Sequence, residues 1–168
     1  WQDPYYKATD VAGLVVEGEN TLVVDVVSLL EEPKMLRDPA YLVGSFALVD
    51  GAIAPQPRKM DRPFTEAGYP FYAGIARYQQ DVEIAEEYTR GCRILLAPGE
   101  VADCCRVLVN DREVVIRLWE PYEVDITLAV RPGKNRIVVE VANSLANLYG
   151  GEQMAGGLRG PARLWVTR

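Results

Sequence analysis

The stretch CCRVLVNDREVVIRLWEPYEVDITLAVRPGKNRIVVEVA, residues 104–142, decides the fold. It holds three runs rich in Val, Ile and Leu, and such runs of β-branched and apolar residues predict strands. The pair Asn110-Asp111 separates the first two runs. Because Asn and Asp tolerate a left-handed backbone, we expect a tight β-hairpin at this pair. The stretch therefore predicts antiparallel sheet.

The same signal recurs along the rest of the chain, where apolar or alternating runs are separated by Gly, Pro, Asn and Asp. We predict strands at residues 21–27, 41–49, 73–84, 93–97, 104–109, 113–118, 123–130, 136–142 and 162–167. A short helix is predicted at residues 29–36, weakened by Pro33. Many short strands with little helix indicate an all-β protein, and we expect a jelly-roll-like sandwich of two sheets.

Two parts of the chain repeat each other. Residues 10–26 read DVAGLVVEGENTLVVDV, and residues 125–141, 115 positions later (125 minus 10), read DITLAVRPGKNRIVVEV. The identical pairs are Asp10/Asp125, Val15/Val130, Gly18/Gly133, Asn20/Asn135, Val23/Val138, Val24/Val139 and Val26/Val141. The repeat predicts that the chain starts near the end of one sandwich unit and runs through a second. The alternative is two unrelated hairpins that share turn chemistry.

The repeat also gives an expected domain organisation. Residues 1–65 are predicted to be an N-terminal repeat fragment, made of strands and a long connection, packed on the sandwich. Residues 66–168 are predicted to form the sandwich itself. The chain opens at Trp1 without Met, in sequence typical of a folded region and with no signal peptide. We therefore expect a fragment of a longer polypeptide.

Composition narrows the classes of function. The 168 residues carry 18 Lys and Arg against 24 Asp and Glu, a formal net charge of -6. Nucleic acid or an anionic membrane would need clustered cations, so we expect neither as a partner. No apolar run approaches the ~20 residues that span a bilayer. Histidine is absent, which removes Ser-His-Asp and Cys-His catalysis and the commonest zinc ligand from this chain.

Three cysteines, Cys92, Cys104 and Cys105, do not fix the compartment. Neighbours on a strand point to opposite faces, so Cys104 and Cys105 are poorly placed to bond each other. We favour three reduced thiols in packed positions over a bridge from Cys92 to one of the others. The compartment stays open, with a secreted or periplasmic location slightly favoured over a cytoplasmic one.

The order of the segments resembles a known group of domains. GYPFYAGIARYQQDVEI, residues 68–84, resembles the first strand of a galactose-binding-like jelly roll. The V-x-V-N hairpin, the D-I-T of residues 125–127 and the P-G-x-N turn are similar to the sugar-binding domain of glycoside hydrolase family 2. With PAYLVGSFAL and the closing GLRGPARLWV, the set most resembles the C-terminal region of bacterial α-L-rhamnosidase-like glycoside hydrolases. One departure is Asp111, where Gly is usual.

The resemblance implies a fold more firmly than an activity. It implies a galactose-binding-like β-sandwich that serves as a non-catalytic accessory module of a larger bacterial glycoside hydrolase, with the catalytic domain in the same polypeptide. The alternative is a purely structural interdomain scaffold without ligand. No cofactor is implied, although many such sandwiches hold a structural calcium ion and no typical calcium loop occurs here. Asp125 is expected to anchor a loop through backbone hydrogen bonds, and Asn135 to support its turn.

Sugar binding calls for an aromatic platform with polar groups beside it. The candidate residues for contact with an oligo- or polysaccharide are Trp119, Glu120, Tyr72, Asn143, Asn147 and Tyr149. Each has a structural alternative: the aromatic rings pack on a loop or another domain, and the asparagines cap turns. No residue is assigned to catalysis, because carboxylate pairs such as Glu100 with Asp103 have nothing that distinguishes them from a solvated surface.

Overall fold

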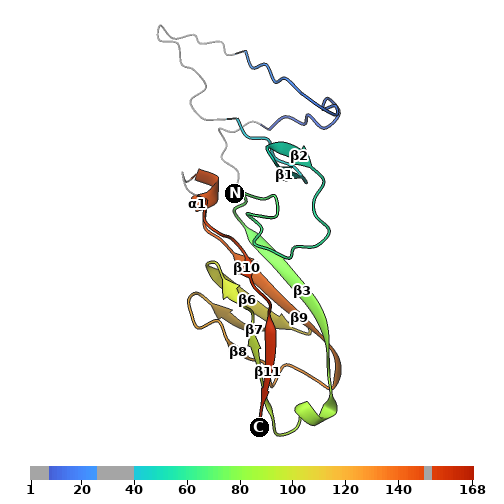
Figure 1. The fold of residues 1–168 in the computed structure, drawn as a ribbon, viewed down its shortest axis with the longest axis vertical. Coiled ribbons are helices and arrows are strands. Elements are labelled where there is room, and N and C mark those ends of the chain that lie inside the picture. Colours follow the sequence, from blue (N-terminus) through green and yellow to red (C-terminus); the bar gives the residue numbers. More distant parts are fainter. Residues whose placement is uncertain (1–7, 26–39, 150–152) are drawn as a thin grey trace. The chain divides into compact units, whose positions relative to one another are not determined.

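The computed structural model describes residues 8–25, 40–149 and 153–168. The chain divides into two compact units, Trp1–Val43 and Gly44–Arg168. The regular elements described in the second unit are almost all strands (Figure 1). The predicted domain boundary between residues 65 and 66 stays a prediction. The predicted helix at residues 29–36 lies outside the described residues.

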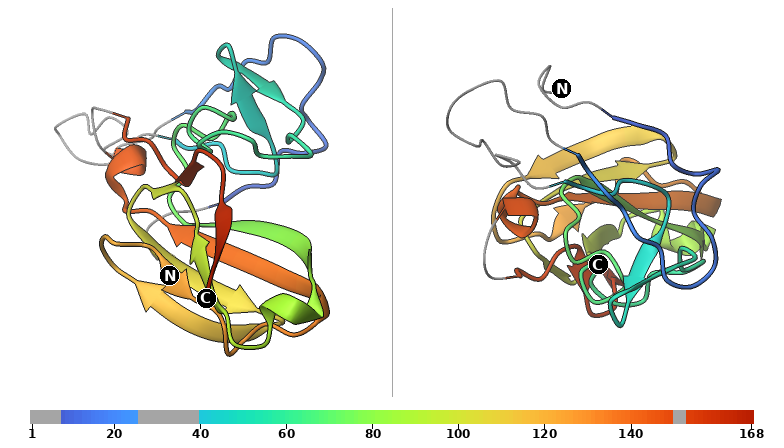
Figure 2. Two further views of the ribbon diagram at one scale, coloured as in Figure 1. Left: turned by 60° about the horizontal axis from the view of Figure 1, so that its bottom comes forward. Right: turned by 90° about the horizontal axis from the view of Figure 1, so that it is seen from above.

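The larger sheet of the second unit has four antiparallel strands in the order β3-β9-β6-β7. These are β3 (Ile75–Ile84), β9 (Gly133–Ala142), β6 (Cys104–Val109) and β7 (Arg112–Arg117). Strand β9 is central, because it pairs along its whole length with β3 and over its second part with β6. The long strands β3 and β9 lie side by side (Figure 2).

The second sheet has three antiparallel strands, in the order β11 (Arg163–Thr167), β4 (Arg93–Ala97) and β8 (Val124–Asp125). Two short ladders complete the strands: β1 (Ala47–Val49) with β2 (Ala52–Ala54), and β5 (Glu100–Val101) with β10 (Leu158–Arg159). The helical elements are the 3-10 helix η1 (Glu86–Tyr88) and the single-turn helix α1 (Ala146–Tyr149).

The core lies between the two larger sheets. Alternate residues of each strand point inward, and the buried cluster consists of Ile84, Ile94, Leu96, Cys105, Val107, Val109, Val124, Ile126, Ile137, Val139 and Val141. The prediction that Val107, Val109, Ile137 and Val139 fill the core is confirmed. This arrangement is the all-β, two-sheet sandwich expected from the sequence. All three cysteines are free thiols, as predicted.

Most strand predictions hold. The predictions at residues 93–97 and 104–109 match the observed bounds, and β3, β7, β9 and β11 differ from theirs by three residues or fewer. The prediction of one strand at residues 123–130 is wrong beyond Asp125. Asp125 Oδ1 accepts the Thr127 N–H at 3.0 Å and Ile126 O accepts the Ala129 N–H at 2.9 Å, so the backbone turns there. The predicted anchoring role of Asp125 is thereby confirmed.

Two further strand predictions are wrong in whole or part. Of residues 41–49 only Ala47–Val49 is a strand, because the chain bends at residues 44–45. Strand β1 then turns at Asp50-Gly51, both with positive φ (51° and 80°), into a strand that we did not predict. In residues 21–27 the described part, 21–25, is exposed and irregular, because no strand among the described residues pairs with it.

Two turns at one end of the sandwich are joined by the side-chain amides of Asn135, which is buried, and Asn110, which is half-buried. The predicted hairpin at Asn110-Asp111 is confirmed, with φ of 53° and 64°. Asn135 Oδ1 accepts hydrogen bonds from Asn110 Nδ2 and from the Arg131 N–H, both at 2.9 Å. Asn135 Nδ2 donates to the carbonyls of Arg131 and Gly133 at 2.7 and 2.9 Å. Asn135 therefore supports its own turn, as predicted, and ties it to the β6–β7 hairpin.

The segment before β3 is anchored by Phe64. Its side chain is 1% exposed and its ring meets that of Tyr72 edge-on, with the centroids 5.3 Å apart. The Phe64 N–H donates to Gly156 O at 2.9 Å. A Cβ on Gly156 would lie 2.2 Å from Phe64 Cζ, so only glycine permits this close approach. Residues before β3 thereby contribute a packed side chain to the second unit.

Candidate ligand-binding groove

The residues predicted from the sequence lie at one end of the sandwich. Trp119 and Glu120 follow the end of β7, and Tyr72 precedes the start of β3. Asn143 follows the end of β9, where the register pairs Ala142 with both Ile75 and Cys104. Asn147 and Tyr149 follow on α1. The sheet thus brings the chain segments that carry all six residues to the same end.

Several of these side chains are already engaged in holding the fold. Asn143 Oδ1 accepts the Gly74 N–H at 2.8 Å, and Asn143 Nδ2 donates to Tyr72 O at 2.7 Å. The Tyr72 hydroxyl donates to Ile75 O at 3.0 Å. Asn147 is buried; it accepts the Met154 N–H at 2.7 Å and donates to Met154 O at 2.9 Å. Asn143 and Asn147 therefore each hold backbone segments together through side-chain hydrogen bonds, and we call such a side chain a staple.

The remaining predicted residues are open to solvent. Trp119 is 73% exposed and Tyr149 68% exposed, and Glu120 is exposed as well. None of the six predicted residues lines either of two grooves on the described surface, which are introduced below. Their role in contacting sugar stays a prediction.

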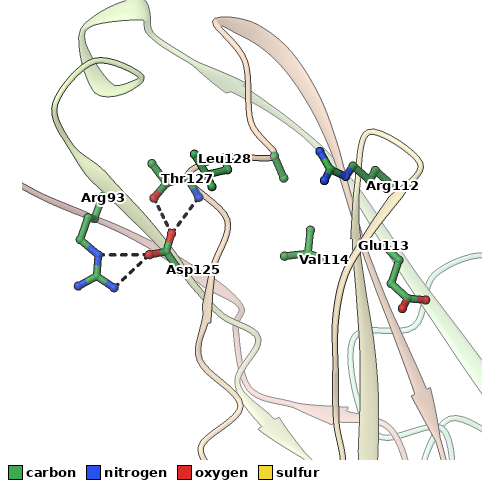
Figure 3. Close-up of a pocket in the computed structure, with 8 residues that line it drawn as sticks. Arg93, Arg112, Glu113, Val114, Asp125, Thr127 and Leu128 are labelled. Atoms are coloured by element: carbon green, nitrogen blue, oxygen red, sulfur yellow. Dashed lines mark hydrogen bonds and ion pairs between the residues drawn. The ribbon is translucent and has the colours of Figure 1, made fainter.

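A groove of about 470 Å³ lies at the opposite end of the sandwich (Figure 3). It is lined by Arg93, Arg112, Glu113, Val114, Asp125, Thr127, Leu128 and Ala129. One wall is the β6–β7 hairpin, and the other is formed by the start of β4 and the turn after β8. Its volume falls in the range of small-ligand sites, about 300–1,000 Å³.

A β-bulge shapes the hairpin wall. Val107 pairs with Val115 while the next residue, Leu108, pairs with Glu113, so Val114 is the extra residue of β7. A bulge redirects the side chain of its extra residue. Figure 3 shows Val114 pointing into the space between the two walls and Glu113 pointing away from it. The side chain of Val114 therefore forms an apolar floor between the two walls of the groove.

The charges on the far wall are neutralised. Arg93 Nε and Nη2 donate to Asp125 Oδ2 at 3.2 and 3.0 Å. Asp125 Oδ1 accepts the Thr127 hydroxyl at 2.6 Å in addition to the Thr127 N–H. These Thr127 hydrogen bonds and, after them, the Arg93 guanidinium lower the pKa of Asp125 below its usual value. Asp125 is thus held as a carboxylate with both oxygens occupied.

Removing the charge of Asp125 is expected to cost stability only above its lowered pKa. The variant Asp125→Asn keeps an oxygen that accepts the Thr127 N–H but loses the ion pair with Arg93. Because the folded pKa lies below the unfolded value of about 3.9, the stabilisation is present at neutral pH and is lost as the pH falls through the folded pKa. The urea midpoint of the variant should therefore lie below that of the wild type at pH 7, and the two midpoints should approach each other as the pH falls through the folded pKa.

The control is Asp61→Asn, on an exposed carboxylate outside the sheets, which should change the midpoint little. A difference between wild type and Asp125→Asn that stays constant from pH 7 to pH 2 would contradict the assignment of the stabilisation to the charge.

The hairpin wall carries a cation, Arg112, beside an ion pair. Glu113 is bound by Arg106, whose Nε lies 2.7 Å from its Oε2. Arg112 makes no ion pair with any of the described residues, and it extends from the hairpin across the groove toward the turn after β8 (Figure 3). The groove therefore offers guanidinium donors beside an apolar surface of Val114 and Leu128. Such a surface suits a ligand that has a ring with an apolar face and, on the same ring, a planar anionic group or a hydroxyl group.

Sequence reasoning did not find this groove. The D-I-T motif drew attention to Asp125 and Thr127, but as a folding signature. Nothing in the local sequence marks Arg112 or Arg93, because the two reach the groove from different sheets.

A second groove of about 350 Å³ is lined by Pro63, Glu100, Val101, Ala102, Met154, Ala155, Gly156, Gly157 and Arg159. Asn147 shapes it indirectly by holding Met154. No group of three or more His, Cys, Asp or Glu side chains suited to a metal ion occurs within the described ranges. Among the same residues no helix is long and apolar enough to cross a membrane.

Comparison with known families defines the class of protein. The family of the sugar binding domain of glycosyl hydrolases family 2 matches residues 55–153, more than half of the chain. The chain belongs to this family. A search of the curated proteins finds no match.

Solved structures give the individual similarities. A rhamnosidase from Novosphingobium sp. PP1Y is 29% identical with a TM-score of 0.54, over 62% of this chain and 12% of that chain. A beta-glycosidase from Bacteroides vulgatus is 28% identical (TM-score 0.46, 56% of this chain, 12% of that one). A glycosyl hydrolase family 2 member from Bacteroides cellulosilyticus is 22% identical (TM-score 0.48, 73% of this chain, 16% of that one). The chain spans less than a fifth of the length of each.

Proposed function

We propose that this chain is a non-catalytic, carbohydrate-binding-like accessory module of a larger, α-L-rhamnosidase-like glycoside hydrolase. The catalytic domain would lie in the same polypeptide. The observation that carries the proposal is the match of residues 55–153 to the sugar binding domain of family 2. The similarity to the rhamnosidase, at 29% identity, supports the class of the parent enzyme.

The state of the carboxylates in the groove supports a non-catalytic role. A glycosidase needs a general acid whose pKa is raised, facing a second carboxylate across the scissile bond. In the groove, Asp125 is ion-paired with a lowered pKa, and Glu113 is bound by Arg106 and points away. Asp125 is therefore not prepared to donate a proton to a leaving group, and Glu113 does not face it across the groove.

The groove is the ligand surface in this proposal. An apolar strip of Val114 and Leu128 can receive the apolar face of a sugar ring, while Arg112 supplies donors to its oxygens. Because the Arg112 charge has no partner among the described residues, a sugar that carries a carboxylate would gain a charge-assisted contact. We therefore propose a uronate-containing glycan as the preferred ligand.

Calorimetric titration with galactose-, rhamnose- and uronate-containing oligosaccharides tests this function. Saturable binding is expected for the uronate series, weakened at least about tenfold by Arg112→Ala, since a lost charge-assisted contact is worth about 1.5–3 kcal/mol. The control is Arg163→Ala, an exposed arginine on β11 outside both grooves, which should bind like the wild type.

A second pair of variants locates the ligand if the groove is not the site. Trp119→Ala removes the aromatic platform at the opposite end, and Trp165→Ala removes a half-exposed Trp on β11. Binding lost only in Trp119→Ala would contradict the groove and support the site predicted from the sequence. Binding lost in neither Trp variant but lost in Arg112→Ala supports the groove.

The alternative function, an interdomain scaffold without ligand, is favoured by one observation. Ile75, Leu118 and Trp119, at the end opposite the groove, are 60%, 59% and 73% exposed. Exposed apolar side chains gathered at one end of a domain are typical of a contact surface. A folded protein that binds none of the oligosaccharides would replace the carbohydrate-binding proposal with this one.

A further inference from the structure

We propose that residues 10–25 are the closing turn and strand of a second sandwich of the same kind. In this proposal residues 21–25 take the place of β9 and lie between two antiparallel strands equivalent to β3 and β6. The proposal concerns the first unit by itself and does not depend on whether the groove binds sugar.

The first turn of residues 10–25 repeats the hydrogen bonds of the turn after β8. Asp10 Oδ1 accepts the Ala12 N–H at 2.9 Å, as Asp125 Oδ1 accepts the Thr127 N–H at 3.0 Å. Val11 O accepts the Leu14 N–H at 2.9 Å, and Ile126 O accepts the Ala129 N–H at the same distance. Each bond is displaced by the 115 positions of the sequence repeat.

The second turn repeats the Asn135 staple. Asn20 Oδ1 accepts the Val16 N–H at 2.9 Å, and Asn20 Nδ2 donates to the carbonyls of Val16 and Gly18 at 2.8 and 3.0 Å. Asn135 makes the same three bonds to Arg131 and Gly133. The glycines adopt the same left-handed conformation, with φ of 99° and 85°.

The alternative of two unrelated hairpins does not explain this agreement. An Asp-capped turn and an Asn-stapled turn are independent local devices. Both turns occur in both copies, with the same hydrogen bonds between equivalent residues and the same number of residues between the two turns. Residues 10–20 therefore share the local backbone structure that leads into β9.

Residues 22–24 are exposed, whereas the equivalent residues of β9 are covered by neighbouring strands. In β9, Ile137, Val138 and Val139 are 6%, 1% and 4% exposed. The equivalent residues Leu22, Val23 and Val24 are 73%, 76% and 49% exposed. Three consecutive apolar residues are typical of a central strand whose two faces are both covered.

The pairing of β9 identifies the occupant. Val138 and Val139 pair with Gln79 and Tyr78 of β3 on one side and with Leu108 and Val107 of β6 on the other. Both neighbours precede β9 in the chain. By the same order, the strands that would cover residues 21–25 belong to a sandwich encoded ahead of Asp10 in the same polypeptide.

One substitution distinguishes a core strand from an exposed segment. Val24→Asp places a carboxylate at the position of Val139, and in residues 1–168 it should leave the melting temperature unchanged because Val24 is half exposed. In the full polypeptide that the gene encodes, the same change should lower the first thermal transition by at least about 5 °C. The matched control is Val16→Asp, at the position that Arg131 occupies in the other copy, which should be silent in both proteins.

Amide hydrogen exchange gives an independent measurement. The Val23 and Val24 amides should exchange rapidly in residues 1–168 and be protected at least about 100-fold in the full polypeptide, as ladder amides are. Equal effects of Val24→Asp and Val16→Asp in the full polypeptide, or equal exchange in the two proteins, would overturn the proposal. So would a gene product that holds no sandwich strands ahead of Asp10. None of these results bears on the glycan titration.

Discussion

Replacing Asn135 by Ala is expected to lower the free energy of unfolding by about 3–5 kcal/mol, one of the two largest effects of any substitution considered. The Asn135 side chain is 1% exposed and makes four hydrogen bonds. Alanine leaves the N–H of Arg131 without its acceptor and two carbonyls without their donor, and it removes one of the two acceptors of the Asn110 amide. A buried polar group that loses its partner costs about 1–3 kcal/mol, and water can reach part of this turn.

The chain supplies its own control in Asn20→Ala. Asn20 makes the same three backbone bonds, but it is exposed, so water replaces them and the loss should stay below about 1 kcal/mol. Urea denaturation followed by tryptophan fluorescence measures both variants. Equal losses for the two would mean that burial does not determine the contribution of the staple.

Phe64→Ala is the second large effect, an expected loss of about 3–5 kcal/mol for the removal of a buried Phe side chain. Phe64 is 1% exposed, and its ring contacts Tyr72 and the backbone of Gly156. The matched control is Phe71→Ala, seven positions along the same segment and 56% exposed, which should cost less than about 1 kcal/mol.

The same variant tests the predicted domain boundary. If the sandwich begins at residue 66 and folds independently, Phe64→Ala should leave its unfolding transition unchanged. If Phe64→Ala instead shifts the whole unfolding transition of the sandwich to lower urea concentration, residue 64 belongs to the sandwich. The measurement is again urea denaturation, with near-UV circular dichroism reporting on the packing of the aromatic rings.

The strands of the core could be predicted because their sequence pattern and their surroundings agree. Residues 104–109 and 136–142 are rich in Val and Ile, and each forms a strand that is flanked on both sides by partners. Residues 21–25 carry the same pattern as β9 but pair with no described strand, and there the prediction was wrong. A sequence states the preference of a segment for strand, whereas the strand itself needs a neighbour to accept its hydrogen bonds.

The groove could not be predicted from the sequence, and the residues that the sequence singled out lie at the other end of the sandwich. Exposed aromatic residues and loop asparagines were correctly placed at a strand end, but Asn143 and Asn147 proved to bind backbone. The groove depends on a bulge at Val114 and on the meeting of Arg93 with Asp125, which are 32 positions apart. Such a meeting follows from which strands become neighbours, and that is set by the whole fold.

The central position of β9 has a consequence for the order in which the protein can be made. Both β3 and β6 leave the ribosome before β9 does, yet each takes β9 as its partner. Until residue 142 has emerged, the β6–β7 hairpin is the only part of the four-stranded sheet that can close, and an isolated hairpin is marginally stable in water. For that interval the edges of β3 and β6 are open to other chains. The nascent domain is therefore protected from aggregation only when β9 has emerged and covers the open edges of β3 and β6.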